Sequence, residues 1–142
     1  MPYLAPSQYK TEVVGESKYQ KAIKEAILYK DLVDKDDMDF SWEKLSATII
    51  LDDNNKFDPG NAVRIEMDGE TVGYLDKQDA SIYRKQITKL NITEPCTCKA
   101  AVYGKRETLG KPMNFGVWLF IDLQRGIQIG EPPKRKKLFG IF

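Results

Sequence analysis

The dipeptide Asp68-Gly69 lies between two short runs in which apolar and polar residues alternate, residues 62–67 and 70–75. Alternation is typical of a β-strand with one buried face, and Asp-Gly between two such runs is a strong signal for a two-residue hairpin turn. The middle of the chain is therefore expected to fold as an antiparallel hairpin.

Further strands and two helices are expected on either side of this hairpin. Apolar residues recur at helical spacing in residues 18–29 and 77–90. Ser17 and Gln20 have the spacing of a capping box for the first helix, and Asp76 is the expected N-cap of the second, with Asp79 at its third position. The acidic stretch 31–43 is expected to be a solvated loop. The remaining strands are predicted at residues 9–14, 45–51, 96–104 and 115–123.

This order of elements favours one small, mainly β domain, an antiparallel barrel or half-barrel with two flanking α-helices. A doubly wound parallel sheet would need more helices between its strands. The 142 residues suit a single core. We expect residues 1–12 to form an N-terminal arm and the start of the first strand, residues 13–125 the domain, and residues 126–142 a basic and apolar tail.

Composition excludes several classes of function. The chain has no histidine, which removes the commonest general base, Ser-His and Cys-His catalytic pairs, and imidazole zinc sites. Its two cysteines, Cys96 and Cys98, are too close in sequence for an unstrained disulfide and too few to close a zinc site, so we expect buried, unpaired thiols and no metal or cofactor. Without a secretory signal or a long apolar run, the chain is expected to be soluble and cytoplasmic, with no membrane partner.

The charges are unevenly distributed although the formal net charge is only +1. Acidic residues predominate in residues 31–43, whereas basic residues predominate in residues 84–106 and 131–142. A chain segregated in this way can present a basic face to a polyanion such as nucleic acid.

An asparagine- and aspartate-rich turn at residues 54–61 contains one large aromatic side chain, Phe57. Such a ring either anchors the loop in the core or lies exposed, where it can stack on a base while neighbouring amides and carboxylates bind sugar hydroxyls. Farther along, Gly73 allows close approach to a ligand or simply marks a bulge. Lys77, at the start of the second helix, is either an anion contact or a solvated charge.

Several of these segments together resemble the HIRAN domain family. The resemblance begins at residues 13–20 (VVGESKYQ) and continues through residues 54–63 (NNKFDPGNAV), which look like the family's Asn-rich, aromatic-Asp-x-x-Asn-Ala-Val signature. It then follows Asp68-Gly69, residues 72–75 (VGYL), Ala80 with Tyr83, and residues 98–100, and it ends with the strand at 117–123. These pieces are colinear and span residues 13–123.

The resemblance implies an OB- or SH3-like β-barrel that binds single-stranded DNA without catalysis, at 3′-hydroxyl ends, in DNA repair or replication. By this analogy Phe57 stacks on the terminal nucleotide and Asp58 accepts the proton of the 3′-hydroxyl. The same likeness implies that Asn54 and Asn55 line the pocket, that Tyr74 contacts a phosphate or base, that Lys77 contacts the backbone, and that Lys18 and Tyr19 take part. The chain departs from the family in having Phe57 where a tyrosine is usual and Ser17 near the place of an arginine.

Lys105 and Arg106 are additional candidates for phosphate contacts, provided that their loop converges on the same face. Two other functions are open. In the first, the protein is an interaction adaptor whose tail, Lys134 to Phe142, docks a replication or repair protein. In the second, it is an enzyme that holds Mg²⁺ through Asp52, Asp53 and Asp58.

Overall fold

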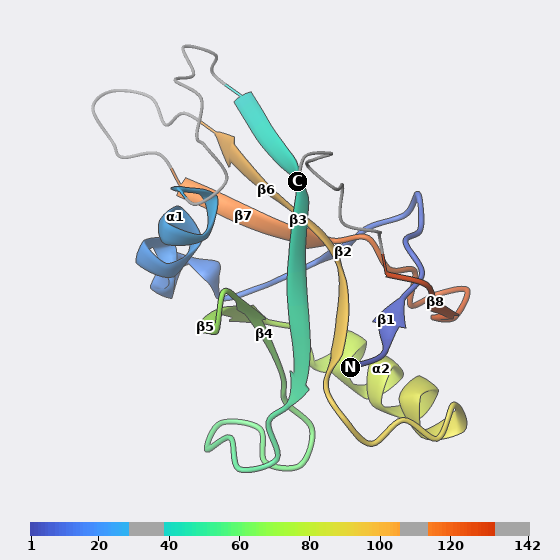
Figure 1. Cartoon of the computed structure of the whole chain (residues 1–142). Helices are drawn as coiled ribbons and strands as arrows, with labels where there is room; N and C mark the ends of the chain where they lie inside the picture. The colour runs from blue at the N-terminus through green and yellow to red at the C-terminus, as the bar shows by residue number, and fades with distance from the viewer. Residues whose placement is uncertain (29–38, 106–113, 133–142) are drawn as a thin grey trace.

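A computed structural model of the chain describes residues 1–28, 39–105 and 114–132 (Figure 1). These residues form an eight-stranded sheet, a short 3-10 helix and two α-helices. In chain order the elements are β1 (Tyr3–Leu4), β2 (Thr11–Glu12), η1 (Glu16–Lys18), α1 (Gln20–Leu28), β3 (Asp39–Leu51), β4 (Val63–Met67), β5 (Glu70–Tyr74), α2 (Lys77–Lys89), β6 (Cys96–Lys105), β7 (Asn114–Leu119) and β8 (Ile129–Gly130).

The sheet curls into a half-barrel. Its main path runs β2-β7-β6-β3-β4-β5 with antiparallel neighbours, and β1 pairs with β6 and β8 beside this path. The two ends of the path meet where Val14, just after β2, bridges Tyr74 at the end of β5. Val14 N donates to Tyr74 O over 2.8 Å, and Tyr74 N donates to Val14 O over 3.0 Å. This bridge places η1 beside the end of β5.

The thirteen-residue strand β3 is longer than the sequence pattern indicates. It begins at Asp39 and pairs with β6 from Asp39 opposite Lys105 to Ile49 opposite Cys96, with a shift of register between Trp42 and Leu45. Residues 39–43, expected in a solvated loop, are therefore strand. The backbone hydrogen bonds supplied by β6 form this part of the strand without an apolar alternation.

The hairpin and the start of α2 form as predicted. Asp68 and Gly69 both have positive φ, 51° and 79°, which is the conformation of a type I′ turn. The Asp76 carboxylate caps α2 by accepting a hydrogen bond from Asp79 N over 2.8 Å. Helix α1, in contrast, begins at Gln20 after η1 rather than at residue 18.

Gln20 does not form the capping box expected with Ser17. Its Nε2 donates to Glu16 O over 2.9 Å and to Phe115 O over 2.8 Å, while its Oε1 accepts from Phe115 N over 2.8 Å. The Gln20 amide therefore ties the start of α1 to strand β7.

The core lies between the curled sheet and the two helices. Ile23 of α1 and Tyr83 of α2 are buried in it, as are Cys96 and Cys98, which share one face of β6 as expected and are unpaired. Leu4 of β1 is fully buried as well, so the packed unit includes the arm before residue 13. No helix among the described residues is long and apolar enough to cross a membrane.

Candidate nucleic-acid interface

A cavity of about 730 Å³ lies between three segments: residues 14–19, the loop of residues 52–62 and the start of α2. We call it the Phe57 pocket. Its volume is in the range of small-molecule and cofactor sites. It is lined by Val14, Gly15, Lys18, Tyr19, Asp52, Asn54, Asn55, Lys56, Phe57, Asp58, Ala62, Tyr74, Leu75, Asp76 and Lys77.

Most of the binding residues predicted from the sequence are brought together here. Lining the pocket are Lys18, Tyr19, Asn54, Asn55, Phe57, Asp58, Tyr74 and Lys77.

Lys105 is not brought to the Phe57 pocket. It pairs with Asp39, at the opposite end of β3 from the loop of residues 52–62. Thirteen residues of extended strand separate the two places by roughly 40 Å of chain. Lys105 is far from the loop because β3 and β6 are antiparallel, so the Cys96 end of β6 lies nearest the loop and the Lys105 end lies farthest from it. Arg106 and the segment from Lys134 to Phe142 lie outside the described residues.

The Asn55 side chain shapes the loop that carries Phe57. Asn55 Oδ1 accepts hydrogen bonds from Phe57 N over 2.9 Å and from Asp58 N over 3.0 Å, an Asx turn, and Asn55 Nδ2 donates to Asp52 Oδ2 over 3.2 Å. With its backbone held in this way, Phe57 has an 80% exposed side chain. The ring does not anchor the loop in the core, and it is available to stack on a ligand.

Asp58 is oriented by neighbours that leave one of its oxygens available. Its Oδ2 accepts a hydrogen bond from Asn61 Nδ2 over 2.9 Å, and Asn61 Oδ1 accepts one from Ser81 Oγ of α2 over 2.9 Å. Within the described part of the chain, Asp58 Oδ1 accepts no hydrogen bond. A carboxylate fixed through one oxygen can accept a hydrogen bond from a ligand hydroxyl through the other.

Two tyrosines form the aromatic wall opposite the loop. The ring centroids of Tyr19 and Tyr74 are 6.5 Å apart and the ring planes are tilted by 50°. Tyr74 Oη donates to Asp52 Oδ2 over 3.2 Å, and burial, together with this carboxylate, raises the pKa of Tyr74. The tyrosine therefore stays neutral in the physiological range.

Arg84 of α2 holds the two ends of the loop together, a role that the sequence does not reveal. Its guanidinium donates to Asp53 Oδ1 over 2.8 Å, to Asn61 O over 2.8 Å and to Ala62 O over 2.7 Å. The available signal is helical spacing: Arg84 follows the buried Ala80 by four residues, which puts it at the edge of the core-facing side.

Two of the three carboxylates expected to hold Mg²⁺, Asp52 and Asp53, form ion pairs with arginines. Asp52 lies 3.5 Å from Arg64 Nη1, and Asp53 lies 2.8 Å from Arg84 Nη1. No cluster of three or more potential metal ligands is found among residues 1–28, 39–105 and 114–132. The geometry therefore gives no support to the metal-dependent enzyme.

The start of α2 is less suited to an anion than its sequence indicates. Asp76 occupies the Asp79 N–H, and both carboxylates lie at the positive end of the helix. Burial, with Asp76 nearby, raises the pKa of Asp79. Lys77 is exposed and is the cationic group that this end of α2 offers to the pocket.

Gly73 accommodates the chain itself rather than a ligand. A Cβ atom at this position would lie 2.4 Å from Val13 Cγ1 and 2.7 Å from Val14 O. The register of the β4–β5 pair also shifts between Ile65 and Glu66, opposite this glycine, so the bulge interpretation is confirmed.

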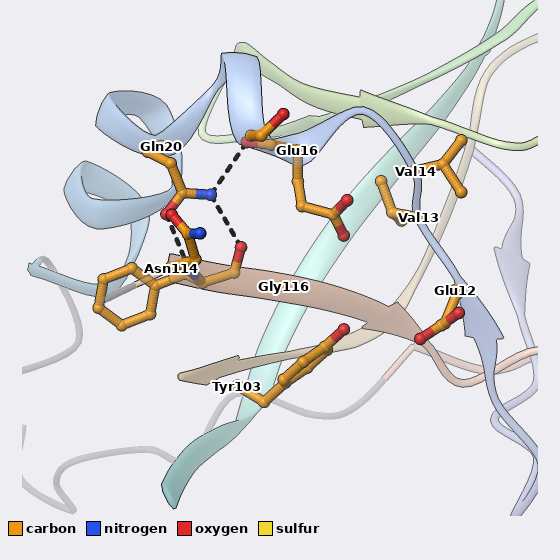
Figure 2. Close-up of a pocket in the computed structure, with 10 residues that line it drawn as sticks. Glu12, Val13, Val14, Glu16, Gln20, Tyr103, Asn114 and Gly116 are labelled. Carbon is orange, nitrogen blue, oxygen red and sulfur yellow. Dashed lines mark hydrogen bonds between the residues drawn. The ribbon is translucent and has the colours of Figure 1, made fainter. Parts of the chain in front are cut away.

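A second hollow, of about 320 Å³, lies between the segment that precedes α1 and strands β6 and β7 (Figure 2). The carboxylates of Glu12 and Glu16 and the hydroxyl of Tyr103 point into it, and the Gln20 amide closes one end. Burial, with a further contribution from Glu12, raises the pKa of Glu16 despite opposing backbone hydrogen bonds. The described lining of this hollow has two carboxylates and no lysine or arginine, whereas three lysines and three aspartates line the Phe57 pocket, so the hollow is the less favourable of the two for a phosphate.

No protein-family model, curated protein or solved structure matches this chain.

Proposed function

We propose that this protein is a non-catalytic, HIRAN-like module with an OB/SH3-related barrel that binds single-stranded DNA, with the 3′-terminal nucleotide in the Phe57 pocket. The observation that carries the proposal is the 80% exposure of Phe57 at the mouth of a cavity that also contains Asp58, Tyr19 and Tyr74. Stacking of a base on an aromatic ring contributes about 1–3 kcal/mol.

Cationic groups at the rim supply the rest of the affinity. Lys18 and Lys77 are exposed, and neither forms a salt bridge with another described residue. Both line the pocket from different segments, η1 and α2. A strand whose terminal base lies on Phe57 can therefore place its phosphates between them.

Recognition of the strand end is assigned to Asp58. Its Oδ1 accepts a hydrogen bond from the terminal 3′-hydroxyl, while Oδ2 continues to accept the hydrogen bond from Asn61 Nδ2. A 3′-phosphate would bring a second anion against this carboxylate and is expected to be rejected.

The test compares oligothymidylates that end in a 3′-hydroxyl or a 3′-phosphate by fluorescence anisotropy, with a 5′-phosphorylated oligonucleotide as the matched control. The 3′-hydroxyl form should bind about tenfold more tightly, a difference of ~1.4 kcal/mol, and Asp58→Asn should remove the preference. The logarithm of the binding constant should fall with the logarithm of salt concentration, at about −0.7 per phosphate contacted.

Two results would contradict the proposal in different ways. Equal binding of the 3′-hydroxyl and 3′-phosphate forms would remove Asp58 from end recognition while leaving strand binding in place. Binding that does not depend on salt would contradict nucleic-acid recognition and favour the protein-interaction adaptor.

A further inference from the structure

A groove between α1 and β5 continues directly from the Phe57 pocket. This α1–β5 groove is a hollow of about 360 Å³, and it shares Lys18 and Tyr19 with the pocket. Away from the pocket, one wall of the groove follows α1 and includes Lys21, and the other follows β5 and includes Thr71. Tyr19, whose ring lies against Tyr74, therefore stands where the two hollows join.

The end of the groove nearest the pocket is cationic. Lys21 follows Lys18 by three residues, and both are exposed. Neither forms a salt bridge with a residue in the described ranges. Two lysines beside a partly exposed aromatic ring are the combination that binds a nucleic-acid backbone next to a stacked base. The Lys21 ammonium also lies close enough to Glu70 to oppose the rise in the pKa of that carboxyl.

The far end of the groove is acidic. Glu25 of α1 faces Glu70 of β5, and the neighbouring Glu25 carboxyl raises the pKa of Glu70. Because this pair repels anions, a phosphate in the groove is directed towards Lys18 and Lys21.

Other hollows that adjoin the Phe57 pocket do not suit a phosphate backbone. The hollow of Figure 2 shares Val14 with the pocket and contains Glu12 and Glu16. Another shares Val14 and Asp76 with it and adds Asp79 and Asp122, against a single lysine. A DNA strand that ends in the pocket must leave it, and of these three hollows the α1–β5 groove is the one that has two lysines in its lining, Lys18 and Lys21.

We propose that the α1–β5 groove is a second nucleotide subsite, which takes the nucleotide on the 5′ side of the one in the Phe57 pocket and holds its phosphate between Lys18 and Lys21. This inference rests on the proposed function, because it assumes that the 3′ end lies in the pocket. It adds Lys21, Thr71 and the Glu25–Glu70 pair to the determinants of binding.

The test uses hexathymidylate with a 3′-hydroxyl and three variants: Lys21→Gln, Lys24→Gln and Glu70→Gln. Lys24 is the matched control, because it is an exposed lysine on α1 that lines neither hollow. Lys21→Gln should weaken binding about threefold and reduce the salt slope by about 0.7, the contribution of one phosphate contact. Lys24→Gln should leave both unchanged, and Glu70→Gln should strengthen binding.

The failures of the two proposals are distinguishable. The subsite would be overturned if Lys21→Gln and Lys24→Gln lost equal DNA affinity. It would also be overturned if neither lost affinity while Phe57→Ala abolished binding. Both results would leave the proposal for the Phe57 pocket intact. If the unaltered protein does not bind hexathymidylate, both proposals are overturned.

Discussion

Tyr74 Oη donates a hydrogen bond to Asp52 Oδ2 over 3.2 Å, and Arg64 Nη1 lies 3.5 Å from the same oxygen. The bond joins the end of β5 to the first residue after β3, where the Phe57 loop begins. It holds the Tyr74 hydroxyl on Asp52, which also lines the pocket, and so fixes the tilt of the Tyr74 ring against Tyr19. The hydroxyl therefore has a structural role and the ring a binding role.

Replacing Tyr74 separates these two roles. Tyr74→Phe should lower the free energy of unfolding by about 1 kcal/mol, the usual net contribution of one hydrogen bond, and leave DNA affinity within about twofold. Tyr74→Ala should lose about 1–3 kcal/mol of binding energy, because the aromatic wall is removed. Urea unfolding and fluorescence anisotropy measure the two effects. An equal loss of affinity in both variants would show that the hydroxyl contacts the DNA.

Replacing Arg84 tests whether its side chain stabilises the loop of residues 53–61. Arg84→Lys keeps the charge but cannot reproduce three donations to Asp53, Asn61 and Ala62. We expect unfolding free energy to fall by about 1–2 kcal/mol and amide exchange to become faster in residues 53–61. The neighbouring exposed Lys85 is the control, and Lys85→Ala should change neither quantity. Unchanged exchange in the Arg84 variant would contradict the clamp.

Features of the fold that depend on neighbouring residues could be predicted from the sequence. The Asp68-Gly69 turn and the Asp76 cap each involve residues within a few positions of one another. In these two cases the local chemistry is sufficient to determine the conformation. The sequence also predicts a turn at residues 54–61, but it leaves open whether Phe57 anchors the loop or lies exposed, and the local Ser17–Gln20 capping box does not form.

Features that depend on distant pairing could not be predicted. The two-residue strand β1 forms because it pairs with β6 and β8, and β8 forms because it pairs with β1. Neither segment has a periodic pattern in the sequence. The bridge between Val14 and Tyr74 has no sequence signal except Gly73, whose missing side chain makes room for it. The position of Lys105 likewise depends on which end of β6 meets the loop, and only the β3–β6 register shows that.

The buried thiol of Cys98 gives a prediction for alkaline pH. Burial, with a smaller contribution from Cys96, raises the pKa of Cys98 to about 12, above its ordinary value of 9.0. The native state therefore holds this proton more tightly than the unfolded state does. The stabilisation is complete below pH ~9 and is lost as pH rises from ~9 to ~12.

Urea unfolding between pH 8 and pH 11 measures this loss, and Cys98→Ala should flatten the dependence on pH while lowering stability at neutral pH. Iodoacetamide should label Cys98 slowly in the folded protein and rapidly in urea, because the thiolate is the reactive form. Rapid labelling of the native protein at pH 7 would contradict the burial of this residue.

Phe57 is the residue whose substitution most directly tests the site. Because its side chain is 80% exposed, Phe57→Ala should change the free energy of unfolding by less than about 0.5 kcal/mol. Phe120→Ala is the control, since that ring is only 7% exposed and its removal should cost about 3 kcal/mol or more. For DNA affinity Phe57→Ala should lose about 1–3 kcal/mol, whereas Phe57→Tyr should retain stacking. A Phe57→Ala protein as unstable as the Phe120 variant would show that the ring anchors the loop, and full DNA affinity in Phe57→Ala would remove the ring from binding.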